Sequence, residues 1–183
     1  MIFLRTIVAF LLFSNFLFSQ ESKIKTEEAQ PETILFIGNS YLYYGDSLHN
    51  HFRRMVEEYF TGYDASSVKS ATIGGSRLKH HNVERLIKPK AISSIEKFDL
   101  VILQGGSGET LTVDSRKEFS YFVKKHIQTI RENNSQAALY MTHAYVEPHK
   151  KFTENQIKTI AETYTKVGIE TVSYTHLTLP TKA

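Results

Sequence analysis

Two runs of consecutive apolar residues constrain the fold of this chain more than any other feature. They read ILFI at residues 34–37 and LVIL within residues 99–103. A strand that is apolar at every position must be covered on both faces, which is typical of a parallel sheet between two layers of helices. Shorter β-type runs at residues 68–73 and 138–142 supply two more strands, and a further strand is expected to start at Gly168.

The segments between these runs have the apolar spacing of amphipathic helices. Asp46 or Ser47 is expected to cap the first helix, and the last is expected to run from Thr153 as N-cap to Gly168 as C-terminal stop. Alternating strands and helices predict right-handed βαβ units. We therefore expect a three-layer α/β/α fold, flavodoxin-like, with a parallel sheet in the order 2-1-3-4 that is incomplete at its C-terminus. The apolar stripes of the first two helices are Leu48, Phe52, Met55, Val56 and Phe60, then Phe119, Phe122, Val123, Ile127 and Ile130.

Residues 1–19 have the pattern of a secretory signal peptide. Arg5 precedes an apolar run, and Ser19 supplies a small residue before a polar sequence. A retained membrane anchor is the alternative, but Asn15 and the nearby serines shorten the run below the roughly 20 residues that span a bilayer. Residues 20–32 read as a charged linker. We expect an exported protein, secreted or periplasmic, with no stable membrane anchor after cleavage.

The segment at residues 172–183 continues neither a helix nor a strand pattern. Its reverse translation resembles the adapter of transposase-prepared sequencing libraries read in frame, and a natural tail is the alternative. We expect it to be foreign to a single domain at residues 33–171. Without Arg5 and Lys182 the formal charge of +3 falls to +1, which leaves no basic surface typical of nucleic-acid binding. The chain has no cysteine, which excludes disulfides and thiolate chemistry.

Small polar loops follow the first three expected strands. Ser40 closes a Gly-Asn-Ser sequence, Gly74 and Gly75 follow the second strand, and Gln104 begins a Gln-Gly-Gly-Ser loop. Because sites in open α/β sheets form at the carboxyl ends of the strands, these loops are expected to meet at one edge of the sheet. An ordinary turn is the alternative for each loop taken alone.

Taken in order, ILFIGNSYLYYGDSL, SATIGGSRL and FDLVILQGGS resemble the successive sequence blocks of the SGNH/GDSL hydrolase superfamily, in the branch whose first block reads G-N-S. The resemblance covers about residues 33–169 and implies a serine esterase with Ser40 as nucleophile. It places the oxyanion hole on the N–H groups of Ser40 and Gly75 and on the side-chain amide of Gln104, with Gly74 as the alternative to Gly75. Gln104 stands where the family commonly has asparagine. The implied substrate is a small-molecule or glycan ester, with a carbohydrate O-acyl group foremost, and no cofactor or metal is implied.

These residue types suit acyl transfer, because a serine nucleophile needs a base and the developing oxyanion needs hydrogen-bond donors. The family's Asp-x-x-His block near the C-terminus is missing, and the adapter-like residues stand in its place. Asp46 and His49 match its spacing, but they follow Ser40 closely and are expected to be a helix cap and a solvated histidine. His176 lies in the suspect tail. We therefore expect the chain to be nearly inactive.

Other chemistry-bearing residues are weaker candidates. His80 and His81 are expected to be a solvated pair rather than metal ligands. His143 is expected either to line the substrate cleft or to pack at a strand end. The tyrosines at 41, 43 and 44 either stack on a sugar ring or pack at the start of a helix. A non-catalytic glycan- or anion-binding module and a flavodoxin-like nucleotide binder are the alternative functions.

Overall fold

The computed structural model describes residues 30–171. The predicted signal peptide, most of the predicted linker and the adapter-like tail lie outside these residues. The predictions made for them therefore stay predictions.

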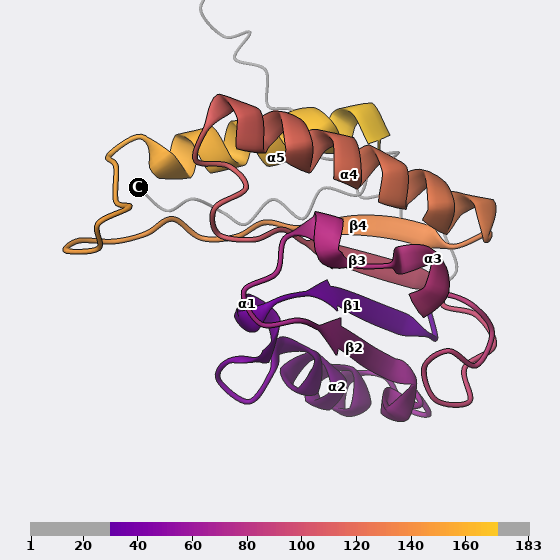
Figure 1. The fold of residues 1–183 in the computed structure, drawn as a ribbon. Helices are drawn as coiled ribbons and strands as arrows, with labels where there is room; N and C mark the ends of the chain where they lie inside the picture. The colour runs from indigo at the N-terminus through magenta and orange to yellow at the C-terminus, as the bar shows by residue number, and fades with distance from the viewer. Residues whose placement is uncertain (1–29, 172–183) are drawn as a thin grey trace, which may run out of the picture.

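Four parallel strands form the centre of the molecule (Figure 1). They are hydrogen-bonded in the order β2-β1-β3-β4, which confirms the predicted order. Ile34 at the start of β1 lies opposite Val68 on one side and Leu100 on the other. The strands are β1 (Ile34–Gly38), β2 (Val68–Thr72), β3 (Leu100–Gln104) and β4 (Gln136–Tyr140).

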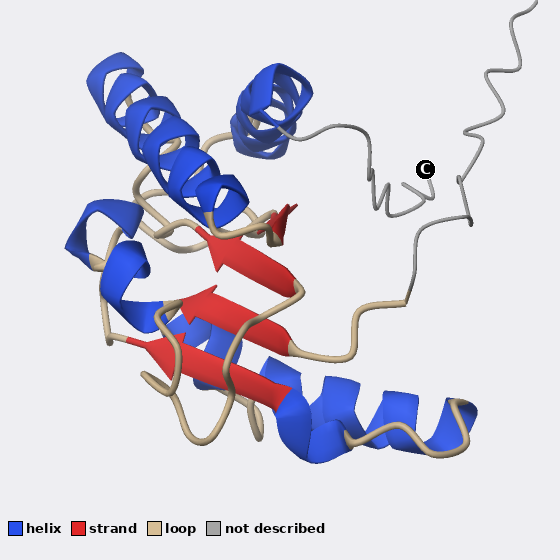
Figure 2. Ribbon diagram, turned by 90° about the vertical axis from the view of Figure 1, so that its right-hand side faces the viewer, coloured by secondary structure: helices blue, strands red, loops and turns tan. Residues whose placement is uncertain are grey.

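Alternation along β1 divides the core into two clusters, one on each face of the sheet. Leu35 and Ile37 pack with the cluster that includes Phe119 and Tyr164, whereas Ile34 and Phe36 pack against Phe52. All five residues of β1 are buried, as the continuous apolar run predicts. The helices that make the two outer layers, visible in Figure 2, are α2 (Leu48–Tyr59) on one face and α3 (Val83–Leu86), α4 (Val113–Glu132) and α5 (Gln156–Thr171) on the other.

The predicted three-layer α/β/α class is thus confirmed for the described residues. Three further short elements lie in the connections between strands and helices. They are α1 (Ser40–Tyr43), η1 (Ala65–Ser67) and η2 (Leu78–His80), and both η elements are single 3₁₀ turns.

The last helix differs from its prediction at both ends. It begins at Gln156 rather than directly after Thr153, and it continues through Gly168 to Thr171. The prediction of a strand that starts at Gly168 is therefore wrong. Tyr164 and Val167 of α5 are buried against the sheet. This packing outweighs the cost of about 1 kcal/mol that a glycine imposes inside a helix.

The start of α2 also differs in detail. Ser47 precedes the helix but makes no capping hydrogen bond with its side chain, and both Asp46 and Ser47 have positive φ angles, of 69° and 63°. The Asp46 carboxylate instead pairs with Arg54, at 2.7 Å. The predicted side-chain cap is therefore wrong, although the helix itself is where the apolar stripe placed it.

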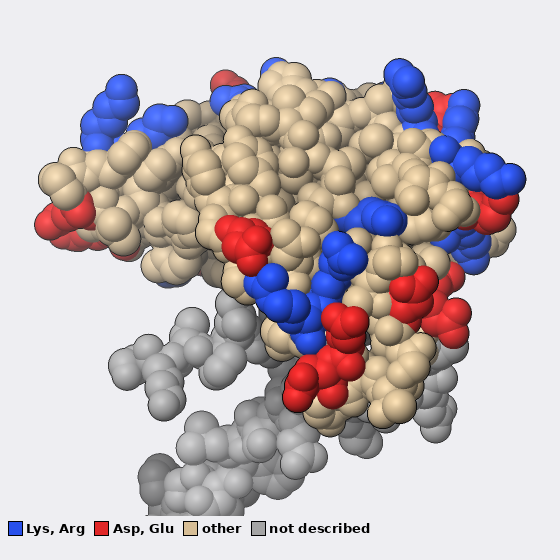
Figure 3. All heavy atoms as spheres, turned by 90° about the horizontal axis from the view of Figure 1, so that it is seen from below, with Lys and Arg blue, Asp and Glu red and all other residues tan. Residues whose placement is uncertain are grey.

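Charged side chains of both signs intermingle on the face of the molecule seen from the α2 side (Figure 3). The ion pairs of the described residues join exposed or half-exposed partners, and such pairs contribute little to stability. Across residues 30–171, none of the helices combines the length and the apolar composition that crossing a bilayer requires.

Candidate functional site

Three loops meet at the carboxyl edge of the sheet, because all four strands point the same way. We call residues 39–47 the first loop, residues 73–77 the second loop and residues 105–112 the third loop. They follow β1, β2 and β3. The first loop carries Ser40, the second carries Gly74 and Gly75, and Gln104 is the last residue of β3, directly before the third loop.

Ser40 is the first residue of α1 and is half-buried. Asn39 precedes it as N-cap, and the Asn39 side chain accepts a hydrogen bond from the N–H of Tyr41, at 3.1 Å. The N–H of Ser40 itself donates to none of the described residues. This end of β1 therefore presents a hydroxyl beside an unused backbone donor.

Asn39 also ties the three loops together, a role that the sequence interpretation missed. Its side-chain nitrogen donates to the carbonyl oxygen of Ser76, at 2.9 Å, and more weakly to that of Gly105, at 3.4 Å. Its backbone N–H donates to Oε1 of Gln104, at 3.0 Å. Asn39 is only 4% exposed. The side-chain amide and the backbone N–H of Asn39 are both buried and hydrogen-bonded, so they fix the first loop relative to the other two.

Gln104 lies beneath this junction, 1% exposed. Its Oε1 accepts from Asn39, and its Nε2 donates to the carbonyl oxygen of Gly105. To donate to an oxyanion, that nitrogen has to turn away from Gly105. Gly38 makes the close approach of Gln104 possible, because a Cβ at that position would lie 2.5 Å from Gln104 Oε1.

Gly74 and Gly75, together with Ile73, form the exposed part of the second loop. Gly75 has a φ of +66°, which favours glycine, and open space surrounds the position that a Cβ would take. Within the described residues neither glycine N–H has a hydrogen-bond acceptor. Both nitrogens thus stay available as donors, and the choice between the two glycines stays open.

His81 departs most from its prediction. It is 5% exposed, and its Nε2 lies 2.8 Å from the Ser76 hydroxyl, with which it shares a hydrogen bond. Burial, with the neighbouring His126 and His80 adding to it, lowers the pKa of His81 to about 4. The imidazole is therefore neutral at physiological pH. The prediction that His80 and His81 form a solvated pair was wrong, because only His80 is exposed.

His49 is not a solvated histidine either. It is half-buried, and its Nδ1 is a buried atom without a hydrogen-bond partner among the described residues. Burial lowers the pKa of His49, and the nearby Arg53 acts in the same direction. Because Asp46 is engaged with Arg54, no hydrogen bond joins Asp46 to His49. The two residues do not form a catalytic pair.

Aromatic and hydroxyl groups gather around Tyr41, the residue that directly follows Ser40. The ring of Tyr41 lies 4.4 Å from that of His143, and the Tyr145 hydroxyl donates to Ser107 Oγ, at 2.6 Å. Burial raises the pKa of Tyr41, with the nearby Tyr145 adding to it. His143 is exposed and Tyr145 half-buried. We call Tyr41, Ser107, His143 and Tyr145 the aromatic wall.

The other two tyrosines of the first loop lie outside this wall. Tyr43 and Tyr44 contact each other edge to face, with ring centroids 5.2 Å apart, and Tyr44 is 73% exposed. From Gln30 to Thr171, no three histidine or acidic side chains are grouped as metal ligands would be.

Comparison with solved structures assigns the fold. A protein from Slackia heliotrinireducens described as an SGNH hydrolase matches with a TM-score of 0.55 and 20% identity over 76% of this chain and 74% of its own. An acetyl xylan esterase matches with a TM-score of 0.54 and 19% identity over 76% and 73%. The esterase EstA from Pseudoalteromonas, solved with monoethylphosphonate as inhibitor, matches with a TM-score of 0.50 and 16% identity over 76% of this chain and 73% of its own. The chain has the SGNH hydrolase fold.

This result confirms the resemblance of the sequence blocks to the SGNH/GDSL superfamily at the level of the fold. No protein-family model matches the chain, and no curated protein matches it in sequence. In the SGNH fold of this chain, the three resembling blocks are the ends of β1, β2 and β3 with the loops that follow them.

Proposed function

We propose that the parent protein is an exported serine esterase of the SGNH type, with Ser40 as its nucleophile. One observation carries the proposal. The half-buried Ser40, its own unused N–H and the unused N–H of Gly75 belong to loops that buried hydrogen bonds of Asn39 hold together. Preorganised donors beside a nucleophile are what acyl transfer needs.

The reaction follows from this arrangement. The Ser40 oxygen attacks the ester carbonyl, the N–H groups of Ser40 and Gly75 stabilise the oxyanion, and the alcohol leaves an acyl-enzyme that water then hydrolyses. Gln104 adds a third donor once its amide turns from Gly105. Each such donor is worth about 3 kcal/mol of barrier. The proposal calls for no cofactor.

Within residues 30–171, no histidine is hydrogen-bonded to Ser40 as a general base would be. We propose that residues 33–171 are an incomplete domain, that residues 172–183 are foreign to it, and that the natural continuation supplies an Asp-x-x-His segment. The histidine would take the proton of Ser40 and pass it to the leaving alcohol, and the aspartate would orient the histidine. As given, the chain should show only residual activity.

A carbohydrate O-acyl ester is the proposed substrate class. The aromatic wall offers the groups that sugars bind, namely ring faces and hydroxyls, beside the nucleophile. One structural neighbour is an acetyl xylan esterase, which supports the same class. Residues 1–19 would direct export, so intact-mass analysis of protein expressed with its leader should find cleavage near Ser19.

The test uses a chain extended with its natural C-terminus. Ser40→Ala should abolish hydrolysis of a short-chain aryl ester and labelling by a fluorophosphonate. Ser107→Ala should keep most of the labelling, because the Ser107 hydroxyl is bound to Tyr145. Labelling that survives Ser40→Ala would reject this nucleophile. Saturable glycan binding without turnover would favour the non-catalytic binding module.

A further inference from the structure

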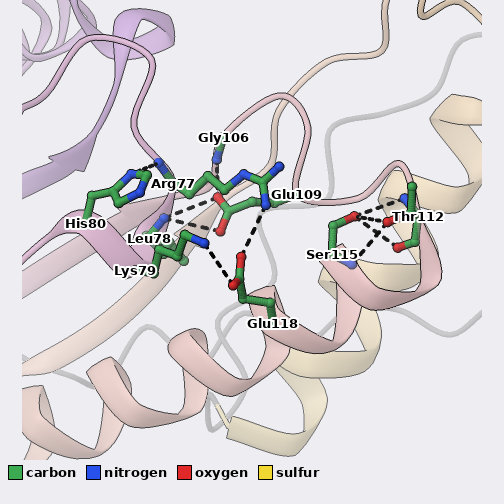
Figure 4. Close-up of polar contacts among 9 residues, drawn as sticks. All are labelled: Arg77, Leu78, Lys79, His80, Gly106, Glu109, Thr112, Ser115 and Glu118. Carbon is green, nitrogen blue, oxygen red and sulfur yellow. Dashed lines mark hydrogen bonds and ion pairs between the residues drawn. The ribbon is translucent and has the colours of Figure 1, made fainter.

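Glu109 is a fully buried carboxylate at the centre of the third loop, with 0% of its surface exposed. Figure 4 shows its carboxylate between two backbone nitrogens that come from different loops. It accepts a hydrogen bond from the N–H of Gly106, and its two oxygens lie 3.2 and 3.3 Å from the N–H of Leu78. These two donors favour the charged carboxylate, whereas burial of the side chain favours the neutral form.

These contacts join the second loop to the third. Leu78 directly follows the second loop and lies 31 residues from Glu109 in the chain. Gly106 comes two residues after Gln104. The two loops also touch, because a Cβ on Gly106 would lie 2.7 Å from the carbonyl oxygen of Ser76. Glu109 therefore links two loops whose backbones touch so closely at Gly106 that no side chain fits between them.

The second loop is held from two sides. Asn39 holds the carbonyl oxygen of Ser76, and Glu109 holds the N–H of Leu78 two residues further on. Gly75 directly precedes this doubly held segment, and within residues 30–171 its N–H donates no hydrogen bond that would fix it. The second loop is also held at its start, where the N–H of Ile73 donates to the carbonyl oxygen of Gly38, at 3.1 Å. Asn39 and Glu109 hold the side that follows Gly75, so the position of the Gly75 N–H relative to Ser40 depends in part on these two links.

We infer that Glu109 is a positioning residue of this site, whose carboxylate holds the second loop against the third and so keeps the Gly75 N–H in place for the oxyanion. This inference rests on the proposed function. It assigns Glu109 no contact with the substrate. It gives the enzyme a group whose ionisation state sets the geometry of the oxyanion hole.

The charged and titratable neighbours of Glu109 come from several elements. Arg77 is near enough to favour the carboxylate, but it is also paired with Glu118 of α4, at 3.2 Å, and Glu118 binds Lys79 as well. Tyr164 of α5 lies nearby, and its hydroxyl accepts from the N–H of Gly105. Behind the second loop, His81 contacts Ser76.

Protonation of Glu109 removes part of the link. Burial raises the pKa of Glu109 above its ordinary value, and the N–H groups of Gly106 and Leu78 only partly oppose this. A neutral carboxyl group places a proton among donors, so at least one of the two N–H contacts weakens. The second loop should therefore loosen as the pH falls through this raised pKa.

The first test follows backbone amide resonances of the full 183-residue chain by NMR during a pH titration. The amides of Gly106 and Leu78 should shift together, at a midpoint above that of an ordinary glutamate, and the amide of Gly75 should shift at the same midpoint. In Glu109→Gln this common transition should disappear, while the titration of His81 remains. A Gly75 amide that does not respond to the titration of Glu109 would overturn the inference.

The second test is kinetic and uses the chain extended with its natural C-terminus. Glu109→Gln should lower kcat about tenfold to a hundredfold with little change in KM, because an oxyanion donor acts in the transition state. Glu118→Gln is the matched control, since it removes a carboxylate that pairs with Arg77 and Lys79 but holds no loop N–H. It should keep kcat within about twofold.

The two tests separate this inference from the proposed function. If the wild-type extended chain does not hydrolyse esters but Gly75 responds to Glu109 in the NMR titration, the function fails and the positioning role stands. If the wild type is active and folded Glu109→Gln has an unchanged kcat, the positioning role fails and the function stands. If Glu109→Gln does not fold, the wild-type titration still decides.

Discussion

Asn39 and His81 are two residues whose contacts in the structure were not predicted from the sequence. Asn39 entered the prediction only as the middle residue of the Gly-Asn-Ser sequence and was given no role of its own, yet it bonds to all three loops. His81 was placed at the surface, yet it is buried against Ser76. Glu109 belongs with them, because its partner Leu78 lies 31 residues away. Contacts at such separations leave no local pattern in a sequence, which is why these roles could not be predicted.

The burial of His81 makes stability depend on pH. Its folded pKa of about 4 lies below the ordinary value of 6.5, so the unfolded chain binds more protons between these two values. Stability from this residue is fully present above about pH 6.5 and is lost as the pH falls toward 4. Urea unfolding should therefore give a free energy about 1 to 2 kcal/mol lower at pH 5 than at pH 7.5 from His81 alone.

His81→Asn should flatten that part of the pH dependence, because asparagine does not titrate. The exposed neighbour gives the matched control, since His80→Asn removes an imidazole from the surface and should leave the slope unchanged. An equal slope in His81→Asn and wild type would show that His81 does not carry this dependence.

The strands were predictable at the scale of elements because each one is a local apolar run. The two fully apolar runs lie on the two central strands, β1 and β3, and the predicted bounds of all four strands differ from the observed ones by at most two residues. The end of α5 was not predictable in the same way. Gly168 is a local stop signal, but packing of Tyr164 and Val167 against the sheet is a long-range effect that overrides it.

The contact between the second and third loops should be sensitive to a single methyl group. Gly106→Ala places a Cβ 2.7 Å from Ser76 O and 3.3 Å from Glu109 Oε2, so the backbone of one loop must move. The expected cost is about 1 to 3 kcal/mol of unfolding free energy, measured in urea. Gly108→Ala is the matched control in the same loop, because its nearest atoms would be 3.8 and 4.0 Å away.

Gly108→Ala should stay within about 0.5 kcal/mol of wild type, as most changes without a clash do. Gly106→Ala should also reduce ester hydrolysis in the extended chain, since the same displacement moves the second loop. Equal stability of the two variants would mean that the loops are not in the close contact that the structure shows.

At the scale of the whole molecule, the two faces of the sheet are unequally covered. On the α4 and α5 side, Val101 and Leu103 of β3 are fully buried, at 0% exposure. On the opposite side, Ile102 of β3 is only half-buried, and Tyr140 at the end of β4 is 38% exposed. Here α2 packs against β2 and the Ile34 side of β1. Among the elements of residues 30–171, none covers this part of the apolar surface of β3 and β4 fully.

We predict that the natural continuation beyond Thr171 covers this surface. A chain extended with the natural reading frame should gain at least about 3 kcal/mol of unfolding free energy over the 183-residue chain, because burying each large apolar side chain is worth about 1.5 to 3 kcal/mol. Two shorter comparisons isolate the cause. A chain that ends at Thr171 should match the 183-residue chain within about 0.5 kcal/mol if residues 172–183 are foreign to this fold, as we propose. Both should bind an apolar dye that the extended chain excludes.

If removal of residues 172–183 lowers stability by more than 1 kcal/mol, the tail packs on the domain, and its assignment as foreign sequence is wrong. If the natural frame stops directly after Thr171, or continues without a histidine, the esterase proposal loses its base and fails.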